Sequence, residues 1–162
     1  PPRSTLFPYT TLFRSLARDN NNHLPLHLHL AVYEEDIELI ESLLSAGVSI
    51  SNNEVEGAFS PLHIAVAYGK LDIVKFIMEK GADVSIEADE GLFPIHAAVG
   101  RRGKPDVLDY LLENGADIEA EDNEGRTPIF YAIKDYNMEM ISHLGERGAN
   151  VNHQDQDRKS VV

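Results

Sequence analysis

The stretch that decides the fold is SPLHIAVAYGKLDIVKFIMEKGADVS, residues 60–85. It opens with Ser60 directly before Pro61, a pairing typical of a helix N-cap followed by the first helical residue. Gly69 predicts a reversal of the chain, because glycine adopts turn conformations that other residues avoid. The run after it spaces its apolar residues along one helix face, and Gly81 suits the left-handed conformation that ends a helix. The stretch therefore predicts two helices joined by a tight turn.

The same pattern occurs four times, so an internal repeat is the main feature of the sequence. The other copies are LPLHLHLAVYEEDIELIESLLSAGVS (24–49), FPIHAAVGRRGKPDVLDYLLENGADIE (93–119) and TPIFYAIKDYNMEMISHLGERGANVN (127–152). Their closing glycines follow one another at intervals of 34, 34 and 33 residues: Gly47, Gly81, Gly115 and Gly148. One such unit cannot bury its apolar faces alone, so we expect stacking of the four units to build the core.

The repeat resembles the ankyrin repeat, which has a period of about 33 residues and the marker T-P-L-H-x-A. Ser60-Pro61-Leu62-His63 and Thr127-Pro128-Ile129 carry the marker most clearly. The resemblance implies an all-α solenoid of stacked helix-turn-helix units with protruding β-hairpin fingers. It places units at about 19–52, 53–86, 87–120 and 121–154, within one domain, residues 16–156.

The first and third copies depart from the pattern in length. In the first copy, either Pro25-Leu26-His27 or Leu28-His29 could hold the register of the motif. The third copy has one extra residue in the segment 100–103, which predicts a longer loop between its helices. Leu24 and Phe93 take the cap position in these two copies, so we expect less well capped helices there.

The fourth copy departs in residue type. Thr127 is expected to cap its helix as Ser60 does, but Phe130 replaces the motif histidine. Gly145 takes an apolar position of the second helix, where glycine costs roughly 1 kcal/mol relative to alanine. We therefore expect the fourth unit to be the loosest.

The two ends of the chain do not fit the repeat. Residues 1–15 (PPRSTLFPYTTLFRS) and 157–162 (DRKSVV) resemble a short-read sequencing adapter translated in frame. We expect both segments to be non-native, and the region between them to be an internal fragment of a longer metagenomic reading frame. Prolines interrupt the apolar part of residues 1–15, which disfavours a secretory signal.

The chain is strongly acidic. It has 14 Lys and Arg against 27 Asp and Glu, a formal charge of −13, and without the two end segments the formal charge is near −16. Such a chain is repelled by phosphate backbones and anionic lipid, which disfavours nucleic-acid and membrane partners. No apolar stretch reaches the roughly 18 residues that span a bilayer. There is no cysteine, which excludes disulfides but does not locate the compartment; we favour the cytoplasm.

The histidines that suggest chemistry have simpler explanations. The resemblance implies that His63 and His96 form hydrogen bonds between neighbouring repeats rather than taking part in catalysis. His23, His27 and His29 lie close in sequence, but no nearby cysteine or carboxylate set completes a zinc tetrahedron. We therefore predict no catalytic residue, no metal and no cofactor.

Acidic residues gather at the predicted fingers: Glu54, Glu56, Glu87, Asp89, Glu90, Glu119, Glu121, Asp122 and Glu124. The run 117–123 lacks the glycine and the distant glutamate of a calcium loop. Two interpretations stay open: a solvated acidic surface, or a field that attracts a basic segment of a partner.

The resemblance implies that a partner protein binds across the fingertips and the exposed face of the first helices. Carried over by position, it predicts nine partner-binding residues: Glu56, Phe59, Tyr68, Glu90, Leu92, Arg101, Glu124, Arg126 and Tyr136. Phe59 and Leu92 are the expected apolar anchors, although they could equally pack against adjacent fingers. We thus predict a monomeric, non-catalytic protein-binding module. The alternative is a regulatory or targeting arm of a larger enzyme or effector whose catalytic domain lies outside this sequence.

Overall fold

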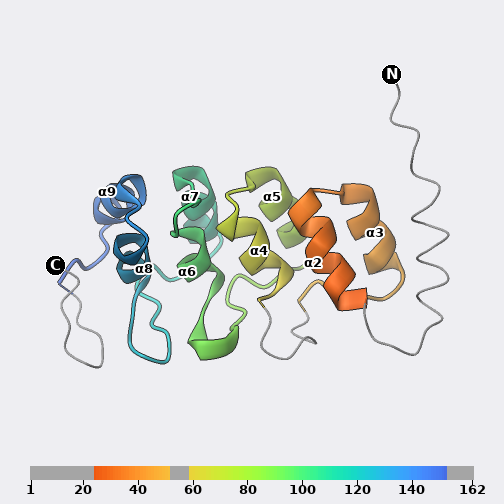
Figure 1. The fold of residues 1–162 in the computed structure, drawn as a ribbon, viewed down its shortest axis with the longest axis horizontal. Coiled ribbons are helices and arrows are strands. Elements are labelled where there is room, and N and C mark those ends of the chain that lie inside the picture. Colours follow the sequence, from red (N-terminus) through yellow and green to blue (C-terminus); the bar gives the residue numbers. More distant parts are fainter. Residues whose placement is uncertain (1–23, 52–58, 153–162) are drawn as a thin grey trace, which may run out of the picture.

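The structure is a computed structural model that describes residues 24–51 and 59–152 (Figure 1). The predictions made for residues 1–15 and 157–162, and for His23, Glu54 and Glu56, lie outside the described residues.

In residues 24–51 and 59–152, eight α-helices form four pairs in a row. Figure 1 shows the second helix of each pair along one side and the first helices along the other, nearer the long loops. The pairs are α2 (Leu24–Glu34) with α3 (Ile37–Ser45), α4 (Pro61–Ala67) with α5 (Leu71–Glu79), α6 (Pro94–Ala98) with α7 (Pro105–Glu113), and α8 (Pro128–Lys134) with α9 (Met138–Glu146). Each first helix contacts the first helix of the next pair. The predicted all-α solenoid of stacked helix-turn-helix units is confirmed.

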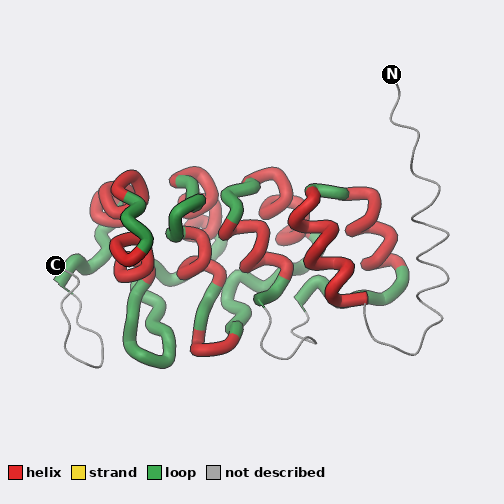
Figure 2. The backbone as a smooth tube through the Cα atoms, viewed as in Figure 1, coloured by secondary structure: helices red, strands yellow, loops and turns green. Residues whose placement is uncertain are grey.

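Where the structure describes them, the fingers are loops rather than β-hairpins. Figure 2 shows them as long connections on one side of the first helices, with the short 3-10 helix η1 (Asp89–Gly91) at one tip. Strand-like pairing in the described residues is limited to a single antiparallel bridge between Ala88 and Leu92. The next residue, Phe93, is already the N-cap of α6, so the chain enters the helix before a ladder can form.

One apolar core runs through all four units. In α5, Ile73, Val74 and Ile77 are buried, and the equivalent residues of α7 are buried in the same way: Val107, Leu108 and Leu111. The predicted stripe on each second helix is therefore confirmed, with Met78 and Leu112 half-buried at its margin.

Glycine is required in the turns for two different reasons. The closing glycines all have φ between 91° and 95°, the left-handed conformation that the sequence predicts. Gly103 is required by close approach instead, because a Cβ added there would lie 2.0 Å from the carbonyl oxygen of Ala98. The third unit's longer loop thus folds back tightly onto α6.

The register of the first unit is set by Leu28-His29. His29 makes the inter-unit hydrogen bond that the motif histidine makes elsewhere, with its Nε2 2.5 Å from the carbonyl oxygen of Phe59. The surplus residues extend α2 by one turn, so Leu24 is the first residue of the helix and not its cap. Pro25 fits there because the first turn of a helix has no hydrogen-bonded N–H to lose.

The capping prediction is right for Ser60 and wrong for Thr127. Ser60 Oγ accepts from the N–H of His63 at 3.4 Å and lies 2.8 Å from His63 Nδ1. Thr127 holds the N-cap position of α8, but its buried hydroxyl has no hydrogen-bond partner among the described residues. The fourth unit has Phe130 in place of the motif histidine, so no ring nitrogen faces that hydroxyl.

Gly145 does not leave a hole in the core. It lies in α9 and is exposed, and an added Cβ would meet nothing within 4 Å. The core of the fourth unit is made instead by Met140 and Leu144, both fully buried.

Candidate partner-binding groove

The motif histidines connect consecutive units. His63 Nε2 lies 2.9 Å from the carbonyl oxygen of Leu92, and His96 Nε2 lies 2.9 Å from that of Ala120. On the other side of each ring, Nδ1 accepts a backbone N–H, from Ser60 at 3.2 Å and from Phe93 at 3.0 Å. Each ring is therefore neutral, with its proton on Nε2, and has the inter-repeat role that the resemblance implies.

Burial keeps these rings neutral. It lowers the pKa of His63 to about 4, and nearby His96 adds to the decrease, while the hydrogen bond to the Leu92 carbonyl opposes it. Burial likewise lowers the pKa of His96. With both nitrogens of each ring engaged in structural hydrogen bonds, neither histidine is placed to act as a general base.

A groove of about 990 Å³ lies along the first helices and the bases of the fingers. Of the predicted partner-binding residues, Phe59, Tyr68, Leu92 and Arg101 line it. The groove is also lined by several residues that were not predicted from the sequence: Leu30, Tyr33, Ile64, Arg102 and Tyr131. A periodic signal was present for three of these, because Leu30, Ile64 and Tyr131 each directly follow the motif-histidine position of their unit.

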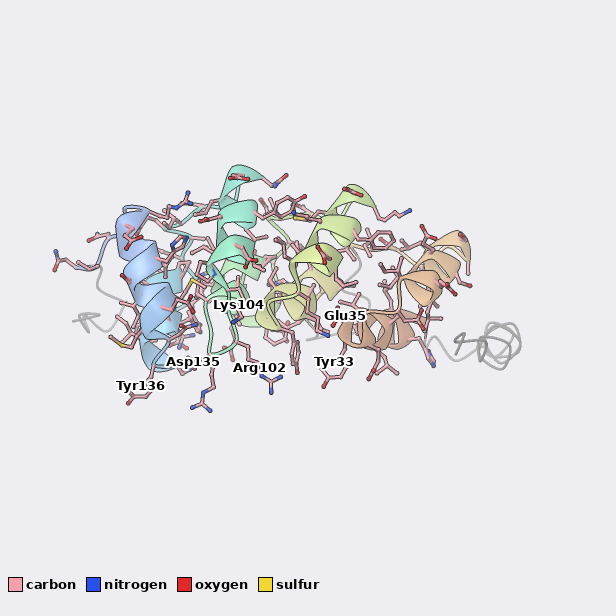
Figure 3. The ribbon with its side chains drawn as sticks, turned by 90° about the horizontal axis from the view of Figure 1, so that it is seen from above. Tyr33, Glu35, Arg102, Lys104, Asp135 and Tyr136 are labelled. Atoms are coloured by element: carbon pink, nitrogen blue, oxygen red, sulfur yellow. The ribbon has the colours of Figure 1, made fainter. Side chains whose placement is uncertain are left out.

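Two tyrosine rings and an arginine lie in contact along the loop edge of the groove, opposite the fingers. The rings of Tyr33 and Tyr68 meet edge to face, with centroids 4.9 Å apart, and Arg102 Cζ lies 5.0 Å from the Tyr68 centroid. Figure 3 shows Tyr33 and Arg102 along one edge of the solenoid. Lys70 closes the first inter-unit junction there, 2.6 Å from Glu35 Oε1.

The third unit's loop is anchored to the fourth unit. Asp135 Oδ2 accepts from the backbone N–H of Arg101 at 3.1 Å, and Asn137 Nδ2 donates to the Gly100 carbonyl at 2.7 Å. The same Asn137 caps α9 by accepting from the N–H of Met140. Two residues of the fourth unit thus fix the backbone that carries Arg101 and Arg102.

Arg126, also predicted as a partner contact, takes part in a largely buried network. Its Nε is 2.7 Å from Asp122 Oδ2, which also accepts from the Tyr131 hydroxyl at 2.5 Å. Asp122 Oδ1 accepts the backbone N–H groups of Glu124 and Arg126. Asp122 is therefore a buried organiser of its finger, not part of the exposed acidic surface.

Hydrogen bonds keep Asp122 ionised. Burial alone would raise the pKa of this carboxyl, but the donors from Tyr131, Arg126 and Glu124 outweigh burial and lower it. Burial raises the pKa of the Tyr131 phenol, and the hydrogen bond to Asp122 raises it further. The network is thus a carboxylate held between a phenol and a guanidinium.

The remaining predicted contacts lie outside the groove. Glu90 and Glu124 are exposed on the fingers, and Glu124 Oε2 is 2.8 Å from Arg126 Nη1. Tyr136 is 84% exposed in the turn between α8 and α9 (Figure 3). Glu56 lies outside the described residues.

In the part of the chain that the structure describes, no group of histidines and carboxylates is placed to hold a metal ion. No helix there is long and apolar enough to cross a membrane.

Comparison with known proteins identifies the family of the chain. No curated protein matches the chain. A family model described as ankyrin repeats (3 copies) matches residues 10–88, 28–122 and 62–155, and the first match begins inside the segment predicted to be non-native. These overlapping matches cover most of the chain, including all four helix pairs, and the protein belongs to the ankyrin repeat family.

Proposed function

We propose that this chain binds a segment of a partner protein along the groove formed by its first helices and finger bases. Ankyrin repeat domains are in general protein-binding modules. The observation that carries the proposal is the exposed apolar lining of the groove. Leu30 is 54% exposed and Phe59 47%, and both line the same open groove on a rigidly packed scaffold. Exposed apolar side chains gathered in one groove are typical of an interaction site.

The acidic fingers favour basic residues on the partner at that side of the groove. Asp89 and Glu90 are exposed at one tip, and Glu124 is exposed on the next finger. The chain as a whole carries a formal charge of −13, which favours encounter with a basic segment. This charge supports faster association more than tighter binding.

The test is a selection of random linear peptides on the full chain, followed by affinity measurement with synthetic copies of the enriched peptides. A Leu30→Ser/Phe59→Ser variant removes exposed apolar contacts from the groove without opening the core. We expect it to weaken binding by at least about tenfold, as loss of a central contact usually does.

The matched control is Ile37→Ser/Met138→Ser. These two residues are 43% and 71% exposed but lie outside the groove. Affinity within about twofold of the parent chain is expected for the control. Equal weakening in both variants would contradict binding at the groove.

A further inference from the structure

The loop edge of the groove is positively charged, whereas the protein as a whole is negatively charged. Among the described residues that line it, the charged side chains other than histidine are Arg101, Arg102 and Asp135. Asp135 uses one oxygen to accept the backbone N–H of Arg101. The loop edge of the groove is therefore a basic site in an acidic chain.

Neither guanidinium is neutralised within the described residues. Arg101 and Arg102 are exposed, and no described carboxylate lies within ion-pair distance of either side chain, whereas other cations of the chain are paired: Lys70, Lys80, Arg126 and Arg147. The exposed Lys104 adds a third cation to the same loop (Figure 3). In a chain with about twice as many acids as bases, this local excess of positive charge is unexpected.

The arginines are also held in place. The Arg102 guanidinium lies over the ring of Tyr68, and Asp135 and Asn137 fix the backbone beside it. A guanidinium held over a ring is restricted in its motion while its N–H donors stay available, which lowers the entropy lost on binding. This geometry suits a carboxylate, which accepts two parallel N–H bonds from an arginine.

We propose that the groove binds a protein segment in which a carboxylate lies a few residues from an apolar anchor. The carboxylate pairs with Arg101 and Arg102, and the anchor packs on Phe59, Ile64 and Leu92. The inference rests on the proposed function and specifies the partner of the same site. It also sets the orientation of the bound segment across the groove, because the acidic fingers favour basic residues at the side opposite the arginines.

The distance between the carboxylate and the apolar anchor of the bound segment follows from the length of α6. This helix of five residues runs between the finger base and the arginine loop, and its length is about 7.5 Å at 1.5 Å per residue. An extended peptide covers this distance in two to three residues of about 3.3 Å each. The carboxylate and the anchor are therefore expected about two to three residues apart. The net charge of the chain does not prevent this, because screening limits the reach of exposed charges to about 10 Å at 0.1 M salt.

The experiment selects random linear peptides on the full chain and on an Arg101→Ala/Arg102→Ala variant. Peptides that enrich on the parent chain are expected to carry Asp or Glu two to three residues from an aromatic or aliphatic residue. Their synthetic copies should bind the double variant at least about tenfold more weakly. Replacing the peptide acid by its amide should weaken binding to the parent chain similarly but have little further effect on the variant.

Two comparison variants separate charge from structure. Lys75→Ala/Lys80→Ala removes the same net charge from exposed positions on and after α5, outside the groove, and should leave affinity within about twofold. Arg101→Lys/Arg102→Lys keeps the charge but removes the planar fork, and should bind with intermediate affinity.

The outcomes distinguish this inference from the proposed function. Peptides that need Leu30 and Phe59 but contain no acid, or bind the Arg101→Ala/Arg102→Ala variant as tightly as the parent chain, would overturn the inference and leave the groove as a binding site. Peptides that bind without any dependence on Leu30 and Phe59, or no enrichment at all, would overturn the proposed function and the inference with it.

Discussion

The second and third units differ from the fourth in how they fix their fingers. In the second and third units, a neutral buried ring, His63 or His96, joins the start of its own helix to the segment that leads into the next unit. The fourth unit has Phe130 at that position. Its own finger, which the ring of His96 reaches at Ala120, is also held by an ionised carboxylate, Asp122. Ala88 occupies the position of Asp122 one unit earlier, so the preceding finger has no carboxylate there.

Two chemistries thus hold neighbouring parts of this backbone. A neutral histidine forms two directional hydrogen bonds at little electrostatic cost. A buried carboxylate must be fully compensated, because an unpaired charge in the interior is expensive. The two solutions therefore differ in their sensitivity to mutation and to pH.

The largest effect is expected from Asp122→Ala. The substitution removes an acceptor of four hydrogen bonds and leaves the Tyr131 hydroxyl and the largely buried Arg126 guanidinium without it. Breaking a buried charged pair by removing one partner costs about 3–5 kcal/mol, and we expect the free energy of unfolding in urea to fall by about 3 kcal/mol.

Glu124→Ala is the matched control, because Glu124 pairs with the same guanidinium from an exposed position. A loss below about 1 kcal/mol is expected for it. Similar losses for the two variants would mean that the network is worth no more than a surface ion pair.

The network also shows where sequence reasoning stops. Helix pairs, closing glycines and the buried stripes follow from local periodicity, and the structure confirms them. Asp122 looked like one more acid on a charged finger, because its burial depends on Tyr131 folding back across nine residues of sequence. Arg102 was missed for a related reason: its place at the groove is set by the extra loop residue and by Tyr68 of the preceding unit. Contacts between units of this kind have no signature in a single copy of the repeat.

A smaller effect is expected in the pH dependence of stability, which should distinguish the buried histidines from Asp122. The pKa of His63 is about 4 in the folded chain and about 6.5 in an unfolded one, so between these values the unfolded state binds more protons. Stability is therefore lost as the pH falls through this window, by roughly 3 kcal/mol at most for His63, and the lowered pKa of His96 acts in the same direction. Asp122 acts in a lower pH range. Its pKa is lowered from 3.8, so its contribution to stability is lost only below that pH.

Urea unfolding at several pH values between 7 and 4 measures this loss. The His63→Gln variant, which has no titrating ring at this position, should be less stable at neutral pH but should depend less on pH in the same window. A variant with the full slope of the parent chain would show that His63 does not carry the acid sensitivity.

The smallest effects compare the two hydroxyl residues that start α4 and α8. Ser60→Ala removes an N-cap that also meets the ring of His63, and should cost about 1 kcal/mol. Thr127→Val replaces a buried hydroxyl that has no partner among the described residues, and keeps the shape of the side chain. Removing an unpaired polar group without opening a cavity should leave stability unchanged or raise it by up to about 1 kcal/mol. Thermal unfolding of both variants measures the difference, and a loss for Thr127→Val as large as that for Ser60→Ala would mean that the Thr127 hydroxyl is paired in solution. The two stability changes are expected to have opposite signs because Phe130 replaces the motif histidine in the fourth unit. A cap hydroxyl contributes fully here only where that histidine lies beside it.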